Sequence, residues 1–348
     1  MRVVKPRTVA AVAALLSLAL VLAACGDDND EPTASPSAAS APEPTDELPP
    51  EGRGIVTEHE DGTRTVESTY GTATVPADPE RIISVIGDVD FEAMLALGVT
   101  PVGAGTQGGN IESGFAPHLG ARTDGVEPLA WADGAPVEAI ARLEPDLIFV
   151  PNQDTADLLD DIAPVVPRGT WVGTEWKEDF LYVGEVLGLA DEAQEMIDEH
   201  ESRAADLRDR LAPVIEGMTV LSPQVAFDHT QVYIDADDAF SSAVLTELGF
   251  TLDDVAERDD SEGIAVSFER FEEIDADILF WQVRQADDGS TDTEGLDAAR
   301  ANPLFERLPA VSAGRYFEVP NRPWYFPTIL GATQILDDVE AALLRASS

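Results

Sequence analysis

Arginine and tryptophan recur together in three short segments of this sequence. These segments are Arg168-Gly-Thr-Trp171, Trp281-Gln-Val-Arg284 and Arg322-Pro-Trp-Tyr325. A guanidinium group binds anionic oxygen atoms through paired hydrogen bonds, and a flat ring packs against bulky or aromatic ligands. Lysine is nearly absent, since Lys177 is the only one after the first five residues. The pattern predicts a binding site for a bulky, partly anionic ligand.

Catalytic and metal-binding patterns are not visible in the sequence. The four histidines, at positions 59, 118, 200 and 229, are widely separated and show none of the spacings that zinc sites use. No nucleophile stands in a motif with its base. We therefore expect neither an enzyme nor a protein that binds bare zinc or manganese, and we expect no cofactor.

The predicted binding residues follow apolar strands. Runs such as 81–86 and 218–221 alternate with helical patterns, which indicates mostly parallel sheets covered by helices, an α/β architecture. In open α/β sheets, ligands bind beyond the carboxyl ends of the strands. This rule selects the following loop residues as walls of a cleft: Thr106, Gln107, Asn152, Gln153, 168–171, 227–233, 281–285 and 321–325.

The two halves of the chain share one pattern. Residues 137–150 can be laid over residues 268–281 without a gap, and both segments end in a wholly apolar run. Each reads as a short helix, a turn and a buried strand. Residues 91–99 and 243–250 form a second pair, in which a helix is stopped by glycine before a strand. The repeat predicts two related lobes.

One long helix is predicted between the lobes. From Asp191 to Leu211 a stripe of mostly apolar residues recurs at intervals of three and four, the spacing of an amphipathic helix. Asp191 is the expected N-cap and Pro213 the expected stop. Some 20 residues reach roughly 30 Å, enough to span two lobes. Because one helix is stiffer than several crossing strands, we expect only a small closure of the lobes.

The first residues predict export and lipid attachment. Basic residues precede an apolar stretch that is short for a membrane-spanning helix and ends in Leu22-Ala-Ala-Cys25, which resembles the lipobox of bacterial lipoproteins. Cys25 is the only cysteine, so no internal disulfide is expected and lipidation is the expected use of its thiol. The segment from 26 to about 60 is rich in proline and acidic residues and lacks aromatic residues, which is typical of a disordered tether. The predicted organisation is a signal peptide (1–24), a lipidated tether (25–62), an N-terminal lobe (63–187), the linking helix (188–213) and a C-terminal lobe (214–348).

The chain is strongly acidic. Asp and Glu number 67 against 21 Lys and Arg, and the formal net charge is −46. Such a charge argues against nucleic acid as a partner. The charge favours solubility, and it suits a saline or alkaline habitat where salt screens the repulsion between like charges. We expect a monomer.

Four segments occur in an order that is specific. They are Val75-Pro-Ala-Asp-Pro-Glu-Arg-Ile-Ile83, Leu95-Ala-Leu-Gly-Val-Thr-Pro-Val-Gly103, Leu143-Glu-Pro-Asp-Leu147 and Asn302-Pro-Leu-Phe305. In this order they resemble the iron-siderophore branch of the periplasmic-binding-protein family, which also includes cobalamin- and haem-binding proteins. The resemblance spans about residues 75–344.

The resemblance implies the solute-binding component of an ABC importer. Such a protein would sit on the extracellular face of the cytoplasmic membrane, held only by its lipid, with its ligand cleft between two lobes joined by one helix. It would capture a ferric siderophore, with iron carried only as a chelate, and deliver it to a dimeric permease. In this family each lobe presents a glutamate to an arginine pocket on the permease. Glu138 and Glu269 match those positions, and the internal repeat pairs them.

The resemblance gives the cleft arginines and aromatic residues a general role in ligand binding. We expect Arg284 to dominate the pocket, with Arg168 or Arg322 assisting. Further contacts are expected from Trp324, Tyr325, Trp281, Trp171, Tyr233 and Gln107.

Two alternatives stay open. The same cleft could hold haem or cobalamin, with His229 or Tyr233 as an axial ligand. A surface lipoprotein that adheres or senses, without transport, would have the same fold and lipid.

Overall fold

The computed structural model describes residues 52–226, 229–235, 237–255, 263–284, 291 and 293–345. These residues belong to one compact unit, Glu47–Ser348. Cys25 and the predicted signal peptide lie outside the described residues. Within the described part of the chain, no helix has the length and apolar character needed to cross a membrane.

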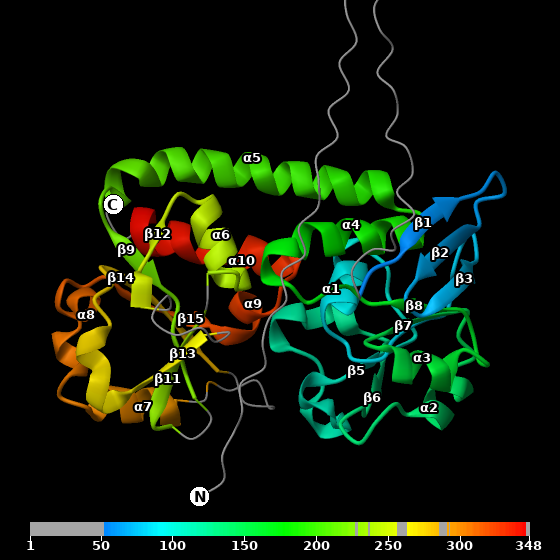
Figure 1. The fold of residues 1–348 in the computed structure, drawn as a ribbon, viewed down its shortest axis with the longest axis horizontal. Helices are drawn as coiled ribbons and strands as arrows, with labels where there is room; N and C mark the ends of the chain where they lie inside the picture. The colour runs from blue at the N-terminus through cyan, green and yellow to red at the C-terminus, as the bar shows by residue number, and fades with distance from the viewer. Residues whose placement is uncertain are drawn as a thin grey trace, which may run out of the picture. The chain divides into compact units, whose positions relative to one another are not determined.

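The body opens with a three-stranded antiparallel sheet (Figure 1). Its strands are β1 (Ile55–Glu58), β2 (Arg64–Ser68) and β3 (Gly71–Val75), in the order β1-β2-β3. Strand β1 lies inside the segment predicted as tether, so the expected boundary at residue 62 is too far along the chain. The reason is pairing with β2, where Val56 lies opposite the buried Val66.

The first lobe is built on a five-stranded parallel sheet in the order β6-β5-β4-β7-β8. Its strands are β4 (Ile82–Ser84), β5 (Gly103–Gly105), β6 (Glu127–Leu129), β7 (Leu147–Val150) and β8 (Val165–Pro167). Its helices are α1 (Val89–Ala96), η1 (Gln107–Gly109), η2 (Ile111–Ser113), η3 (Pro117–Thr123), α2 (Val137–Arg142), α3 (Gln153–Leu159), η4 (Gly173–Glu175) and α4 (Trp176–Leu187).

The second lobe has a seven-stranded mixed sheet. Its path is β12-β9-β14-β10-β11-β13, and β15 pairs with β14. The strands are β9 (Thr219–Leu221), β10 (Gln224–Val225), β11 (Gln231–Asp235), β12 (Thr251–Leu252), β13 (Gly263–Ser267), β14 (Ile278–Val283) and β15 (Tyr316–Pro320). The α/β class is confirmed, but β11 runs antiparallel to both of its neighbours, so this sheet is only partly parallel.

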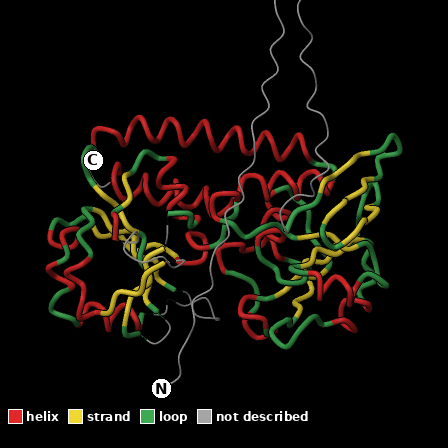
Figure 2. Tube along the Cα trace, in the orientation of Figure 1, coloured by secondary structure: helices red, strands yellow, loops and turns green. Residues whose placement is uncertain are grey.

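Short helices surround the second sheet. They are α6 (Phe240–Glu247), η6 (Phe268–Glu273), α7 (Glu294–Ala301), η7 (Phe305–Arg307), α8 (Pro309–Ser312), α9 (Asn321–Tyr325), α10 (Ile329–Glu340) and the π-helical turn η8 (Ala341–Arg345). Figure 2 shows how helices and loops flank the strands of both lobes.

The internal repeat predicted from the sequence is present in the fold. Helix α2 precedes β7 as η6 precedes β14, although η6 is a 3-10 helix. The two aspartates that the repeat pairs have the same task. Asp146 accepts hydrogen bonds from the backbone of Glu80 and Arg81 just before β4, and Asp277 accepts one from Thr219 at the start of β9. Each carboxylate therefore fixes the beginning of the strand beside its own.

The linking helix is α5 (Ala190–Ile215), which spans both lobes in Figure 1. Two details differ from the expectation. Leu189, rather than Asp191, is the N-cap residue, and Pro213 lies inside the last turn instead of ending the helix. A proline there removes one backbone donor, and the helix ends two residues later. One cluster of buried apolar side chains runs from β4 and β7 through α4 and α5 to β14 and α10, so the lobes share a core.

Candidate ligand-binding site

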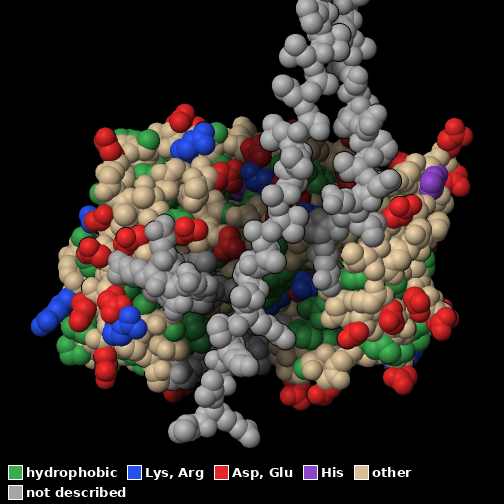
Figure 3. All heavy atoms as spheres, in the orientation of Figure 1, with side chains coloured by type: hydrophobic (Ala, Val, Ile, Leu, Met, Phe, Trp, Pro, Cys, Tyr) green, Lys and Arg blue, Asp and Glu red, His purple; other side chains and the backbone are tan. Residues whose placement is uncertain are grey.

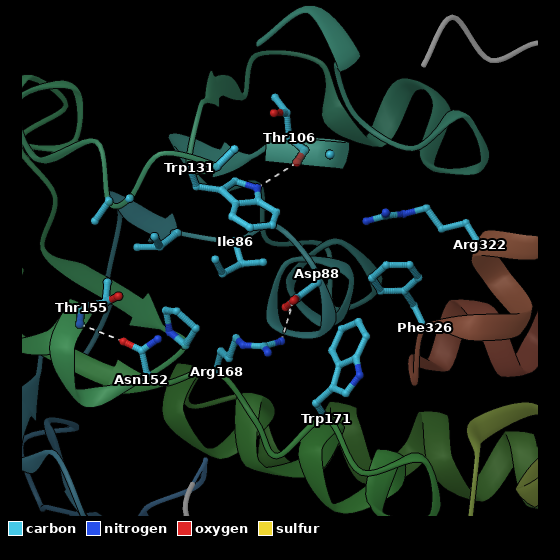
Figure 4. Close-up of a pocket in the computed structure, with 16 residues that line it drawn as sticks. Ile86, Asp88, Thr106, Trp131, Asn152, Thr155, Arg168, Trp171, Arg322 and Phe326 are labelled. Atoms are coloured by element: carbon cyan, nitrogen blue, oxygen red, sulfur yellow. Dashed lines mark hydrogen bonds and ion pairs between the residues drawn. The ribbon is translucent and has the colours of Figure 1, made fainter. Parts of the chain in front are cut away.

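A cavity of about 640 Å³ lies at the carboxyl ends of the strands of the first sheet. Every strand of that sheet is followed by residues that line it, and the second lobe adds Arg322 and Phe326. The lining consists of Val85, Ile86, Asp88, Thr106, Gly108, Trp131, Ala132, Gly134, Ala135, Pro151, Asn152, Thr155, Arg168, Trp171, Arg322 and Phe326 (Figure 4). The place is the one that the strand-end rule predicts.

Arg168 provides one positive charge in the cavity. Its Nη1 donates to Oδ2 of Asp88 at 2.6 Å, and its guanidinium carbon lies 5.2 Å from the ring centre of Trp171. Nε of Arg168 is buried and has no hydrogen-bond partner. The backbone nitrogen of Val89 also donates to the Asp88 carboxylate, at 2.7 Å. Arg168 is thus held in place by an ion pair and retains an unused donor.

Arg322 provides a second positive charge, from the opposite lobe. Its guanidinium carbon lies 3.9 Å from the ring centre of Phe326, and its buried Nε has no hydrogen-bond partner. Burial lowers the pKa of Arg322, while the negative charges of Glu92 and Asp88 act in the opposite direction. Figure 4 shows its side chain reaching across the cavity toward residues of the first lobe.

Trp171 has an unusual backbone conformation. Its φ is +64°, a region that a bulky residue rarely adopts, and such residues concentrate at functional sites. Its ring meets the ring of Phe326 edge-on at 4.9 Å. A clamp holds the preceding residue: Asp179 accepts from the Thr170 backbone at 3.0 Å and from Arg53 at 3.0 Å. Burial raises the pKa of Asp179, and the hydrogen bonds from Thr170 and the charge of Arg53 oppose that rise.

Buried acidic groups lie behind the cavity on α1. Asp90 is 1 % exposed, and neither of its carboxyl oxygens has a hydrogen-bond partner. Burial and, after it, the negative charge of Asp88 raise the pKa of Asp90 to about 8. Burial alone would also raise the pKa of Glu92, but His118 lowers it below its ordinary value. Glu92 accepts a hydrogen bond from Thr328 at 2.8 Å, a contact between the two lobes.

The remaining wall is largely apolar. Ile86, Pro151 and two alanines line it, and Nε1 of Trp131 donates to the backbone oxygen of Thr106 at 2.9 Å. Asn152 caps α3 by accepting from the Thr155 backbone at 2.9 Å. The cavity therefore has a charged wall and an apolar wall, which suits a ligand that carries both charged and apolar groups.

The structure brings some of the predicted ligand residues together. Arg168, Trp171 and Arg322 line the cavity. Tyr325 is 42 % exposed and lines an adjoining depression of about 300 Å³, which it shares with Trp171. Gln107 begins η1, and its side chain lies outside the described residues.

Two predicted tryptophan contacts are corrected by the structure. Trp281 is 0 % exposed within β14 and packs on Phe271 and Phe305 in the second-lobe core. Trp324 is also 0 % exposed, stacks on Phe280 at 5.0 Å and donates through Nε1 to Asp338. Neither tryptophan lines the cavity, although Trp324 borders the adjoining depression together with Trp171 and Tyr325.

The leading role expected of Arg284 stays a prediction. Arg284 lines a separate crevice of about 20 Å³, together with His229 and Trp281, and is not part of the cavity lining. Tyr233 lies on β11, is 41 % exposed and is also outside that lining. The cavity belongs to the first sheet, whereas these residues belong to the second.

Asp88 and Phe326 were missed in the sequence. Asp88 follows β4 by four residues, so the strand-end rule applied to 82–84 would have selected it. Phe326 directly follows the selected loop. Trp131 follows β6, a strand of three residues that contains a proline and therefore gives little periodic signal.

The two predicted docking glutamates have matching places. Glu138 is the second residue of α2 and Glu269 the second residue of η6, and both side chains are exposed. Among the described residues, no three His, Cys, Asp or Glu side chains converge as a metal site would require.

The chain resembles known proteins in sequence. The model of the family described as periplasmic binding protein matches residues 87–323. The chain belongs to this family. This periplasmic binding protein is 30 % identical over 298 residues to the probable siderophore-binding lipoprotein YfiY of Bacillus subtilis, covering 81 % of this chain and 88 % of that relative. It is 27 % identical over 267 residues to the Fe(3+)-citrate-binding protein YfmC of the same organism, covering 75 % and 79 %.

Solved structures show the same fold. The triscatecholate siderophore binding protein FeuA from Bacillus subtilis, complexed with ferri-bacillibactin, superposes with a TM-score of 0.66 at 19 % identity. The match covers 81 % of this chain and 98 % of that one. At this identity the likeness establishes the fold of this periplasmic binding protein.

Proposed function

We propose that this protein is the solute-binding component of an ABC importer and captures a ferric siderophore in the cavity between Arg168 and Arg322. The observation that carries the proposal is the pairing of two guanidinium groups, one from each lobe, over aromatic rings. Iron-bound oxygens of a chelate carry negative charge and accept such donors. The names of the relatives, a probable siderophore-binding lipoprotein and an Fe(3+)-citrate-binding protein, support the same ligand class.

The dimensions fit a chelate rather than a bare ion. A cavity of about 640 Å³ falls within the range of roughly 300–1,000 Å³ that small-molecule sites occupy. Arg168 and Arg322 both line the cavity, so their guanidinium groups can donate to oxygen atoms of a chelate. Iron would enter and leave as part of the chelate.

Haem is less favoured than a ferric siderophore. The described lining of the cavity contains no histidine, tyrosine, cysteine or methionine that could be an axial ligand. His229, one of the two candidates, lies in the small crevice beside Arg284.

Transport requires a permease and a position at the membrane. Glu138 and Glu269 present exposed carboxylates at equivalent points of the two lobes, which suits a two-fold permease with two arginine pockets. Lipid on Cys25 would hold the protein at the extracellular face of the cytoplasmic membrane, and two relatives are named lipoproteins. Figure 3 shows acidic side chains scattered over one face of the molecule, and the formal net charge of −46 argues against nucleic acid as a partner.

Two experiments test the proposal. Equilibrium dialysis with radioiron-loaded hydroxamate, catecholate and citrate chelates, and with haem and cobalamin, should give submicromolar binding to at least one ferric chelate. Binding only to haem or cobalamin would change the cargo. Deletion of the gene should abolish uptake of the bound chelate, whereas unchanged uptake would favour adhesion or sensing.

A further inference from the structure

The charges around the cavity limit the charge of the ligand. Arg168 is already neutralised, because its ion pair with Asp88 measures 2.6 Å and both side chains are largely buried. Arg322 makes no ion pair within 4.0 Å among the described residues, although the charges of Glu92 and Asp88 act on it from α1. Two arginines and one aspartate therefore give the described lining a net charge of +1, and the nearby Glu92 carboxylate offsets part of that charge.

The Asp88–Arg168 pair is not easily opened by a ligand. A ligand anion that took Arg168 for itself would leave the Asp88 carboxylate buried beside Asp90 and Glu92 without its positively charged partner. Separating a buried ion pair is strongly unfavourable because it leaves a charge without a partner. The chain as a whole adds long-range repulsion, since its formal net charge is −46.

Ferric siderophores differ widely in charge. A hydroxamate group carries one negative charge and a catecholate two, so three hydroxamates balance Fe³⁺ while three catecholates leave a trianion. A trianion would bring at least two negative charges into the cavity that no described lining residue balances. A neutral or monoanionic chelate would be matched by Arg322, and its alkyl parts would meet the apolar wall of Ile86 and Pro151.

We propose that the ligand is a ferric chelate with no more than one net negative charge, of the hydroxamate or mixed hydroxamate–carboxylate class, and that Asp88 discriminates against trianionic tris-catecholates. This inference rests on the proposed function and narrows it. Asp88 acts here as a specificity-determining residue, since its carboxylate lines the cavity and neutralises the charge of Arg168.

The test compares ferrichrome, a neutral trihydroxamate chelate, and the ferric complex of a citrate-based dihydroxamate with ferric enterobactin, a tris-catecholate trianion. Tryptophan quenching of the purified protein should show that at least one low-charge chelate binds about tenfold or more tighter than the trianion. The reason is that Arg322 can balance one negative charge of a ligand, whereas the other negative charges of the trianion meet no positive partner. Equal or tighter binding of the trianion would overturn the inference and leave the proposed function intact. Silence toward every ferric chelate would overturn the proposed function itself.

Variants separate the charge effect from misfolding. Asp88→Asn frees Arg168 and should reduce discrimination against the trianion by about tenfold. Asp124→Asn is a matched control, since Asp124 is exposed and does not line the cavity, and should leave the ratio of affinities unchanged. If Asp88→Asn does not fold, Arg322→Gln serves instead. It should weaken binding of the monoanionic chelate about tenfold more than that of the neutral one, and equal losses would overturn the inference.

Discussion

Replacement of Asp90 by asparagine should change how the stability of this protein depends on pH. Asp90 lies in the first turn of α1, is 1 % exposed, and has no hydrogen-bond partner for either carboxyl oxygen. Burial, followed by the negative charge of Asp88, raises its pKa from 3.8 to about 8. At neutral pH the folded protein therefore keeps a proton on Asp90 that the unfolded chain has lost.

The sign and size of the effect follow from that pKa. Between pH 4 and 8 the folded state binds more protons than the unfolded state, so stability falls as pH rises, and the loss is complete above pH 8. A shift of this size corresponds to on the order of 5 kcal/mol. Asparagine has the same shape and cannot ionise. Asp90→Asn should therefore stabilise the protein by up to about 5 kcal/mol at pH 9, and change it by about 1 kcal/mol or less at pH 4.

The assay is urea unfolding at a series of pH values from 4 to 9, followed by circular dichroism. Asp124→Asn, at an exposed aspartate after η3, is the control and should follow the parent curve. Parallel stability curves for Asp90→Asn and the parent would refute the reasoning, because they would mean that Asp90 ionises alike in the folded and unfolded states.

Three further predictions concern ligand binding and transport. Arg53→Ala removes the positive partner of Asp179, the buried carboxylate that also binds the Thr170 backbone beside Trp171, so chelate affinity should fall about three- to tenfold. The exposed Arg142→Ala is the control and should leave the affinity unchanged. Equal affinities of parent and Arg53→Ala in a titration would mean that this contact has no role in binding. Trp171→Ala should weaken binding about tenfold and Trp171→Phe much less, and the idea fails if both bind like the parent. Glu138→Lys with Glu269→Lys should abolish uptake of radioiron chelate while affinity stays unchanged, and normal uptake would exclude these glutamates from docking.

The position of the cavity could be predicted because it depends on a local feature. Strand ends are visible in the sequence as the points where apolar runs stop, and parallel strands bring those ends to one edge. Arg168, Trp171 and Arg322 were found in this way, and all three line the cavity. The internal repeat likewise marked Glu138 and Glu269, because it is a direct comparison of two segments.

Trp281, Trp324 and Arg284 are expected to contact the ligand but do not line the cavity. The reasons are the direction of their side chains and the arrangement of the lobes. The run ending at Trp281 continues as strand to Val283, so Trp281 lies within β14 and points into the core. In α9 the residues Arg322 and Trp324 are two positions apart, and contacts with Phe280 and Asp338, which lie outside that segment, hold the tryptophan in the interior. Whether Arg284 reaches the cavity depends on contacts between lobes, which no local pattern encodes.

Binding of a ferric chelate in the cavity is tested most directly by tryptophan fluorescence, because Trp131 and Trp171 both line it. The purified protein is titrated with hydroxamate, catecholate and citrate chelates of iron, alongside a variant carrying Arg168→Ala and Arg322→Ala. The account predicts saturable quenching by a ferric chelate at submicromolar concentration in the parent and its loss, by about a hundredfold in affinity, in the double variant. No quenching by any chelate, or equal quenching of parent and variant, would contradict the account.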